Sequence, residues 1–320
     1  MPWNGFPSRR TAVGVLAAFG LAGSSPAKRA MRHPKIEGLT TWSESVMVLY
    51  FDGNLENGFS LRLSRYPALE TSWLWCHVLF DGHLYAYTDQ FLPSSTEQIG
   101  PDQDVTSYSV PRMQARMARS GTSADLKRLS FSVQLLAHRD RSGIDGPGSV
   151  PVKLDGIFYP GALRANSPAG RFERSGRVEA DLIVGDKEKS FSGVAKAHEQ
   201  TQTNPRFGPS FTYAMLWGEQ ASMTGLFAQN RAYGDFETSG DDRPIREFLI
   251  EKWSPNRKFA VVLSDGKRIE GLARTTRSLD VPVFDRMWHG HIVSAEAGGY
   301  HMVGMINDWK PEDQKYAIAI

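Results

Sequence analysis

The chain has 320 residues, a length typical of two domains or of one large β domain. Its 41% hydrophobic and 22% charged residues are typical of a globular protein with a packed core. Lys and Arg number 37 against 35 Asp and Glu, but residues 1–30 hold four of the basic residues and no acidic one, which leaves 33 basic and 35 acidic residues beyond residue 30. This balance gives no support to a nucleic-acid partner.

Residues 1–30 resemble an export signal. Arg9 and Arg10 precede an uncharged apolar stretch, 11–22, and small residues follow it. A basic start, a short apolar segment and a small-residue cleavage site are typical of bacterial secretory signals, and the arginine pair favours the twin-arginine route. We therefore expect an exported, periplasmic protein. If the segment is instead a disordered arm or a short helix, the protein is cytoplasmic.

From residue 42 onward, apolar and polar residues alternate with a period of two, which predicts half-buried strands. The first predicted strands are 46–51, 58–66, 72–80 and 84–87. They pair as two hairpins, the second with Asp81-Gly82 in its turn. The run 72–80 is apolar on both faces, so we expect it to be packed inside and covered outside. Its Cys76, the single cysteine of the chain, is expected to be a buried hydrophobe rather than a nucleophile.

The middle of the chain, 90–127, is less regular, and within it we expect a short helix over 113–119 that Gly121 closes. Further predicted strands are 128–137, 152–159, 176–184, 190–197, 211–217, 223–230, 247–253, 258–263, 267–275, 288–295 and 300–307. Many short strands with turns between them predict an all-β protein of antiparallel barrels or sandwiches. We divide it at a Pro/Gly-rich link into an N-terminal β domain, 31–204, and a C-terminal β domain, 205–320.

The polar triplet His198-Glu199-Gln200 lies at the end of a predicted strand, just before that link. Such a cluster can be held rigidly while it faces a cavity, and His198 has an ordinary pKa near neutrality. We predict catalytic roles for His198 and Glu199 and substrate binding for Gln200. Alternatively, the triplet only satisfies backbone groups. In a regular strand Glu199 would face away from His198, so joint action requires the strand to end or bulge here.

Aromatic residues are abundant, with 8 Trp, 10 Tyr and 17 Phe. Most are expected in the core, and a surplus would suit a cavity for a bulky apolar ligand. The predicted cavity-lining residues are Trp75, Tyr213, Trp217, Trp288 and His289. On a strand, His289 and His291 share one face and could bind a metal, but no third ligand is identifiable. We therefore favour a polar cavity wall, with no metal and no cofactor.

Two short motifs carry a resemblance to a known family. Tyr50-Phe51-Asp52-Gly53 and the later Gly193-x-Ala195-x-Ala197-His198-Glu199-Gln200, together with the long all-β spacing, resemble the two-domain lipocalin-like proteins over roughly residues 40–310. That group includes hydroxyneurosporene synthase (the carotenoid 1,2-hydratase) and tocopherol cyclase-like proteins. The resemblance implies two tandem lipocalin-like β-barrels, with the ligand site in the mouth of the first or near their junction. Hydratases of this group use an Asp-His pair; His198 matches the His, Ala197 replaces the Asp, and Glu199 is the candidate substitute.

These observations predict a cofactor-independent hydratase or cyclase. It would protonate a bulky hydrophobic, isoprenoid-derived substrate, with His198 as general acid and aromatic walls that stabilise developing positive charge. The alternative is a non-catalytic lipocalin-like carrier of a hydrophobic ligand, which needs only the shape of the cavity. Both hypotheses involve a hydrophobic small molecule, no nucleic acid and no transmembrane helix in the mature chain, and both are compatible with contact at a membrane surface.

Overall fold

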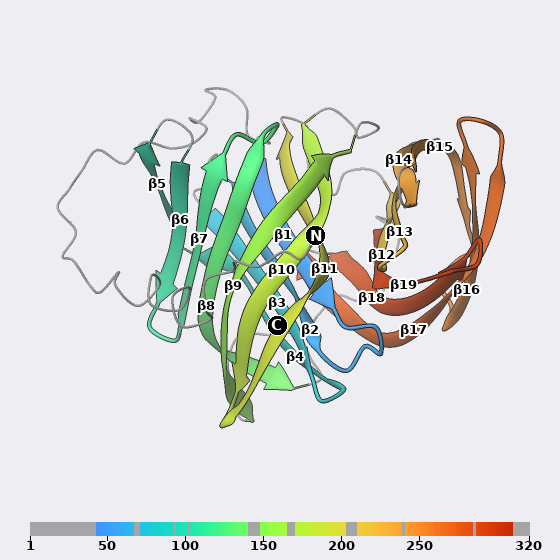
Figure 1. The fold of residues 1–320 in the computed structure, drawn as a ribbon. Coiled ribbons are helices and arrows are strands. Elements are labelled where there is room, and N and C mark those ends of the chain that lie inside the picture. The colour runs from blue at the N-terminus through green and yellow to red at the C-terminus, as the bar shows by residue number, and fades with distance from the viewer. Residues whose placement is uncertain are drawn as a thin grey trace, which may run out of the picture.

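The computed structural model describes residues 43–66, 71–92, 94–100, 103–139, 148–164, 170–202, 210–238, 241–283 and 286–309. These residues form strands joined by turns and short loops, which confirms the all-β prediction (Figure 1). Within these ranges there is no helix long and apolar enough to cross a membrane. The predicted export signal lies outside the described residues.

The first sheet contains the strands of the N-terminal half. They are β1 (Ser43–Phe51), β2 (Gly58–Tyr66), β3 (Thr71–Phe80), β4 (His83–Leu92), β5 (Ser94–Gly100), β6 (Gln103–Val110), β7 (Met113–Gly121), β8 (Leu126–Arg139), β9 (Ser149–Leu163), β10 (Arg171–Val184) and β11 (Lys187–Gln202). Their order is β4-β3-β2-β1-β11-β10-β9-β8-β7-β6-β5. A further pairing of Tyr85 and Ala86 in β4 with Arg139 and His138 in β8 closes strands β1–β4 and β8–β11 into a ring.

The second sheet is a closed antiparallel barrel in which each strand pairs with the next. Its strands are β12 (Phe211–Trp217), β13 (Ala221–Ala228), β14 (Arg231–Thr238), β15 (Asp241–Ile250), β16 (Asn256–Leu263), β17 (Arg268–Val283), β18 (Arg286–Ala297) and β19 (Tyr300–Trp309). The change of sheet therefore falls between Gln202 and Phe211. The two barrels stand side by side, with β18 and β19 next to the N-terminal strands (Figure 1).

Tight two-residue turns set the register of the hairpins. Asp81 and Gly82, with φ of 50° and 73°, join β3 to β4, as a two-residue turn of this twist requires. Gly298 and Gly299, with φ of 58° and 86°, do the same between β18 and β19. The short helix expected over 113–119 is wrong: Met113, Ala115 and Met117 are buried on alternate positions of β7, so the period is two.

Both barrel interiors are filled by side chains. Val48, Phe59, Phe131 and Phe158 belong to the core inside the N-terminal barrel, and a separate core that includes Phe248 fills the C-terminal barrel. A small barrel is expected to be packed in this way. The space for a ligand must therefore be sought elsewhere among the described residues.

A third apolar cluster joins the outer faces of the two barrels. On β3, Leu74, Cys76, Val78 and Phe80 point into the N-terminal barrel, while Trp73, Trp75 and Leu79 face outward, as the two-sided apolar pattern predicted. These outward residues share one cluster with residues of β12, β17, β18 and β19. The C-terminal partners are Tyr213, Met215, Trp217, Leu279, Val281, Val283, Trp288, Ile292, Val303, Met305 and Trp309. The barrels are thus joined through an apolar junction.

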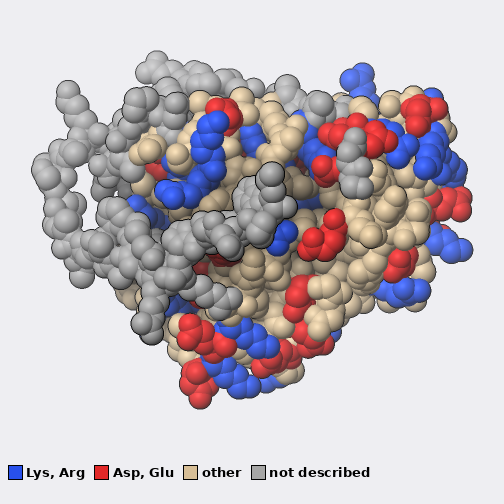
Figure 2. Space-filling model, viewed as in Figure 1, with Lys and Arg blue, Asp and Glu red and all other residues tan. Residues whose placement is uncertain are grey.

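Charged side chains are mixed on the exterior. On the face in Figure 2, Lys and Arg alternate with Asp and Glu, and neither sign dominates the described surface. This distribution agrees with the near-neutral composition beyond residue 30 and offers no basic stripe for nucleic acid on that face.

Candidate functional site

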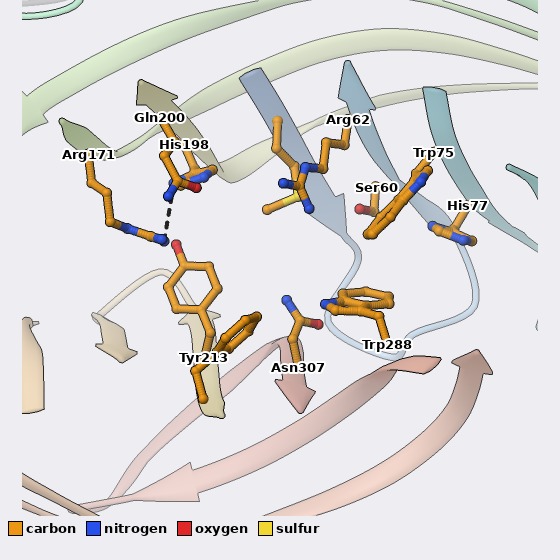
Figure 3. A pocket seen from close by; sticks show the side chains of 12 residues that line it. Ser60, Arg62, Trp75, His77, Arg171, His198, Gln200, Tyr213, Trp288 and Asn307 are labelled. Atoms are coloured by element: carbon orange, nitrogen blue, oxygen red, sulfur yellow. Dashed lines mark hydrogen bonds between the residues drawn. The ribbon is translucent and has the colours of Figure 1, made fainter. Parts of the chain in front are cut away.

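A pocket opens within the junction of the two barrels (Figure 3). One wall is the outer face of the N-terminal barrel and the other comes from the C-terminal barrel. The lining residues are Met47, Ser60, Arg62, Trp75, His77, Arg171, His198 and Gln200 on the first wall, and Phe211, Tyr213, Trp288 and Asn307 on the second. The empty space in and in front of the pocket, open solvent included, is about 480 Å³. Neither barrel alone could form it.

His198 is held by a buried carboxylate from the neighbouring strand. It faces Glu173 directly across the β10–β11 ladder, and its Nδ1 lies 2.9 Å from Glu173 Oε1. The exposed fractions are 3% for both residues. Because a carboxylate only accepts hydrogen bonds, this contact places the proton on Nδ1 and leaves Nε2 for other chemistry.

Two further side chains complete the environment of Glu173. The Tyr213 hydroxyl, from the opposite barrel, lies 2.8 Å from both carboxylate oxygens. Arg171 donates from Nη2 to Oε1 over 3.0 Å, and its guanidinium lies 4.6 Å from the centre of the Tyr213 ring. Arg171 also approaches His198 Nδ1 at 3.4 Å, but the shorter, charge-assisted contact with Glu173 determines the tautomer.

The electrostatic environment keeps this cluster in one protonation state near neutral pH. Burial lowers the pKa of His198 to about 4, although the charge of Glu173 opposes this shift. The pKa of Glu173 is lowered because its contacts with His198 and Arg171 outweigh the effect of burial. Burial and the adjacent carboxylate raise the pKa of Tyr213 well above its ordinary value. At pH 7 the site therefore contains a neutral imidazole, a carboxylate and a neutral phenol.

Aromatic rings form the middle of the pocket. Trp75 of β3 and Trp288 of β18 meet across the junction with ring centroids 5.0 Å apart, inclined at 51°. The Arg62 guanidinium lies 4.8 Å from the centre of the Trp75 ring, in cation–π geometry. Flat apolar surface and positive charge are thus placed side by side along the first wall.

The structure brings five of the predicted site residues to this pocket: His198, Gln200, Trp75, Tyr213 and Trp288. Glu199 is not among them. Strand β11 continues regularly through its pairing with β1 as far as Gln202, without the bulge that joint action with His198 required. Glu199 is consequently on the opposite face of β11, where Oε1 lies 3.8 Å from Arg119 Nη1. Glu173 takes the position beside His198 instead.

Two other predicted residues lie away from the pocket. Trp217 packs in the junction, where it stacks on Phe51 with centroids 5.8 Å apart. His289 is on the face of β18 opposite Trp288, and its Nδ1 lies 2.7 Å from Asp280 Oδ1. His291 shares that face, but its Nδ1 accepts a hydrogen bond from Trp253 Nε1 at 2.9 Å. Among the described residues, no group of three His, Cys, Asp or Glu side chains could hold a metal ion.

Sequence reasoning missed Arg171 and Glu173. Both lie in Arg171-Phe172-Glu173, whose alternating polar positions continue the period of the predicted strand 176–184 toward the N-terminus. Arg62, His77 and Asn307 lay on predicted strands, but nothing in the sequence indicated that their faces meet.

Comparison with known proteins supports the fold. No protein-family model matches the chain, and no curated protein matches its sequence. The crystal structure of CghA superposes with a TM-score of 0.60 at 12% sequence identity, over 85% of this chain and 88% of that one. The crystal structure of kievitone hydratase from Nectria haematococca gives a TM-score of 0.48 at 11% identity, over 85% and 90%. The likeness to CghA shows that the fold is shared over most of both chains. The shared fold, like the structure itself, agrees with the expectation of two tandem β-barrels.

Proposed function

We propose that this protein is a hydratase or cyclase that transfers a proton at a hydrophobic, isoprenoid-derived substrate bound between the two barrels. His198 is the proton-transferring residue, Glu173 orients and stabilises it, and the walls formed by Trp75 and Trp288 hold the apolar part of the substrate.

The observation that carries this proposal is the buried contact between His198 and Glu173 on the pocket wall. Burying a carboxylate is costly unless it is well partnered, and here Arg171 and Tyr213 supply the partners. The apolar junction alone would hold the barrels together without such a group. A carboxylate that fixes the tautomer of a histidine beside a cavity is the usual arrangement of a histidine general base.

The protonation state assigns an order to the chemistry. A neutral His198 first accepts a proton at Nε2, either from water that adds to the substrate or from an acidic X–H bond of the substrate. The imidazolium formed is stabilised by Glu173, and it then returns the proton to a substrate carbon. The net result is addition of water to a double bond that an adjacent electron-withdrawing group activates, or ring closure by proton relocation, with all atoms retained. In this proposal His198 acts first as a base, and not as the general acid that was expected from the sequence.

The rival hypothesis is a carrier that binds a hydrophobic ligand without changing it. It uses the same pocket and the same aromatic walls. A carrier requires the shape of the cavity and is insensitive to the proton held between His198 and Glu173. The two hypotheses therefore differ in the effect of conservative changes in that pair.

The test begins with native mass spectrometry of the purified protein to identify a co-purifying ligand, followed by incubation with isoprenoid and polyene compounds in D₂O. We expect product with deuterium on carbon, detected by mass spectrometry. His198→Ala and Glu173→Gln should each lower turnover by about 10²–10⁴-fold. Glu179→Gln, on the exposed part of the same strand β10, is the matched control and should retain activity. Unchanged turnover in His198→Ala would refute the catalytic assignment, and ligand binding without turnover in the wild type would favour the carrier.

A further inference from the structure

The pocket also holds, in its middle and at the side away from His198, polar atoms that the proposed reaction does not use. Figure 3 shows the lining residues running from Arg171 and His198 on one side, past Asn307, Trp75 and Trp288, to His77 on the other. A pocket for a pure hydrocarbon would be apolar along this length. The side chains of His77 and Asn307 are therefore unexplained by an isoprenoid hydrocarbon as substrate.

Both side chains are buried and incompletely hydrogen-bonded. His77 is 1% exposed and Asn307 is 4% exposed. Neither His77 Nε2 nor Asn307 Oδ1 has a hydrogen-bond partner among the described residues. Buried polar atoms are normally satisfied, so an orphaned atom on a residue that lines a cavity points to a partner supplied by a ligand or by water. Here two such residues line one pocket, from opposite walls.

Their chemistry restricts that partner. Asn307 Oδ1 is an acceptor and requires an O–H or N–H donor. Burial lowers the pKa of His77 to about 3, so its imidazole is neutral and offers one donor and one acceptor nitrogen. A hydroxyl group can satisfy either residue, because it donates and accepts. A carboxylate could not donate to Asn307.

We propose that the pocket binds an oxygenated, amphipathic ligand, whose flat apolar part lies against the paired rings of Trp75 and Trp288 and whose hydroxyl groups bond to Asn307 and His77. This inference rests on the proposal that the junction pocket is the ligand site, and it narrows the substrate from a hydrocarbon to a hydroxylated compound. The two polar residues determine specificity, since a ligand without hydroxyl groups would leave both unsatisfied.

A pair of small probes tests the proposal by binding alone. Dissociation constants of 2,6-dihydroxynaphthalene and 2,6-dimethylnaphthalene are measured by equilibrium dialysis for the wild type, His77→Leu and Asn307→Leu. In each variant the ratio of the two dissociation constants should change by roughly tenfold, so that the dimethyl compound binds better relative to the diol. His291→Leu removes a buried histidine of the C-terminal barrel that does not line the pocket, and it should leave the ratio unchanged. Thermal unfolding confirms that each variant is folded.

The readout separates this proposal from the catalytic one. Binding of the two probes requires no proton transfer, so a lost preference in His77→Leu and Asn307→Leu does not depend on whether His198 is catalytic. An unchanged ratio in both His77→Leu and Asn307→Leu, an equal weakening of both probes, or the absence of diol binding to the wild type would each overturn the proposal.

Discussion

Three buried histidines are kept neutral by their surroundings, and each costs stability when the solution becomes acidic. Burial lowers the pKa of His77 to about 3, and that of His198 and His291 to about 4. In the unfolded chain the same groups take up a proton near pH 6.5. Below that pH the unfolded state binds more protons than the folded state, so the free energy of unfolding falls as the pH decreases.

His77 provides the simplest test, because burial is the cause of its shift and no carboxylate is coupled to it. Between pH 7 and pH 4.5, its neutral state should account for a loss of about 2–3 kcal/mol in the free energy of unfolding. We expect His77→Leu to remove this part of the pH dependence. Urea unfolding at several pH values measures it, and parallel curves for wild type and variant would contradict the expectation.

Part of the site could be predicted from the sequence, because some of its residues lie close together on one strand. His198 and Gln200 are two residues apart on one strand, so their common face follows from the period of a strand. Glu173 reaches His198 through the pairing of β10 with β11, and Tyr213 comes from the other barrel. Register and docking depend on the whole fold. For the same reason Glu199 was a natural but misplaced candidate: its position next to His198 in the chain puts it on the other face.

Strand β11 serves both barrels through its two faces. Ala195 and Ala197 contribute to the N-terminal core, while Lys196 and His198 point toward the junction. Lys196 donates to the backbone oxygen of Met223 over 2.9 Å, which joins β11 to β13. Burial and the nearby Arg164 lower its pKa to about 7. The strand that carries the candidate catalytic histidine is thus also hydrogen-bonded to the second barrel.

Replacement of Lys196 by Met should stabilise the protein at or below pH 7. The pKa of Lys196 is about 7 in the folded state and about 10.4 in the unfolded state. Burial of the cation therefore reduces stability most below pH 7 and progressively less toward pH 10. The gain is partly offset by lost hydrogen bonds, which leaves roughly 1–3 kcal/mol.

Thermal unfolding of Lys196→Met and wild type at pH 6.5 and pH 10 checks this expectation. Lys187→Met, an exposed change on the same strand, is the control and should have little effect. A Lys196→Met variant less stable than the wild type at pH 6.5 would show that the hydrogen bonds to β13 outweigh the burial of charge.

Most individual strands could be predicted, because the alternation of apolar and polar residues in the sequence indicates which side chains are buried. No strand was expected over β5, β6 or β14, and β7 was expected to be helical. In 113–119 the alternation of Met113, Ala115 and Met117 is masked by residues with good helix propensity, and pairing with β6 and β8 overrides that propensity. The closure of the first barrel depends on two residue pairs between β4 and β8, too few to leave a pattern.

The apolar junction should make the two barrels unfold together. Domains that meet through a small polar contact move and unfold independently, whereas a large hydrophobic contact couples them. Here the contact includes Leu49, Trp75 and Met215, each at most 3% exposed. We expect a single calorimetric transition for the wild type.

A charge placed in the junction should separate the two barrels. Leu49→Asp buries an unpaired carboxylate between them and is expected to split the transition into two. Leu249→Asp, at a leucine that is 48% exposed, is the matched control and should keep one transition. Two transitions in the wild type would show that the junction does not couple the barrels. An undivided transition in Leu49→Asp would show that their coupling does not depend on the apolar contact at Leu49.

The position of the pocket outside both barrel interiors has a consequence for how such a protein can change over time. Residues that line it, such as Ser60, Phe211 and Asn307, are not members of the packed core of either barrel. A mutation there alters the pocket without creating a void in a barrel. New ligands can therefore be acquired by exchange of wall residues, or by a small change in how the barrels dock, while each barrel keeps its own foldable core. Two chains with this architecture could act on unrelated compounds even where their barrels superpose closely.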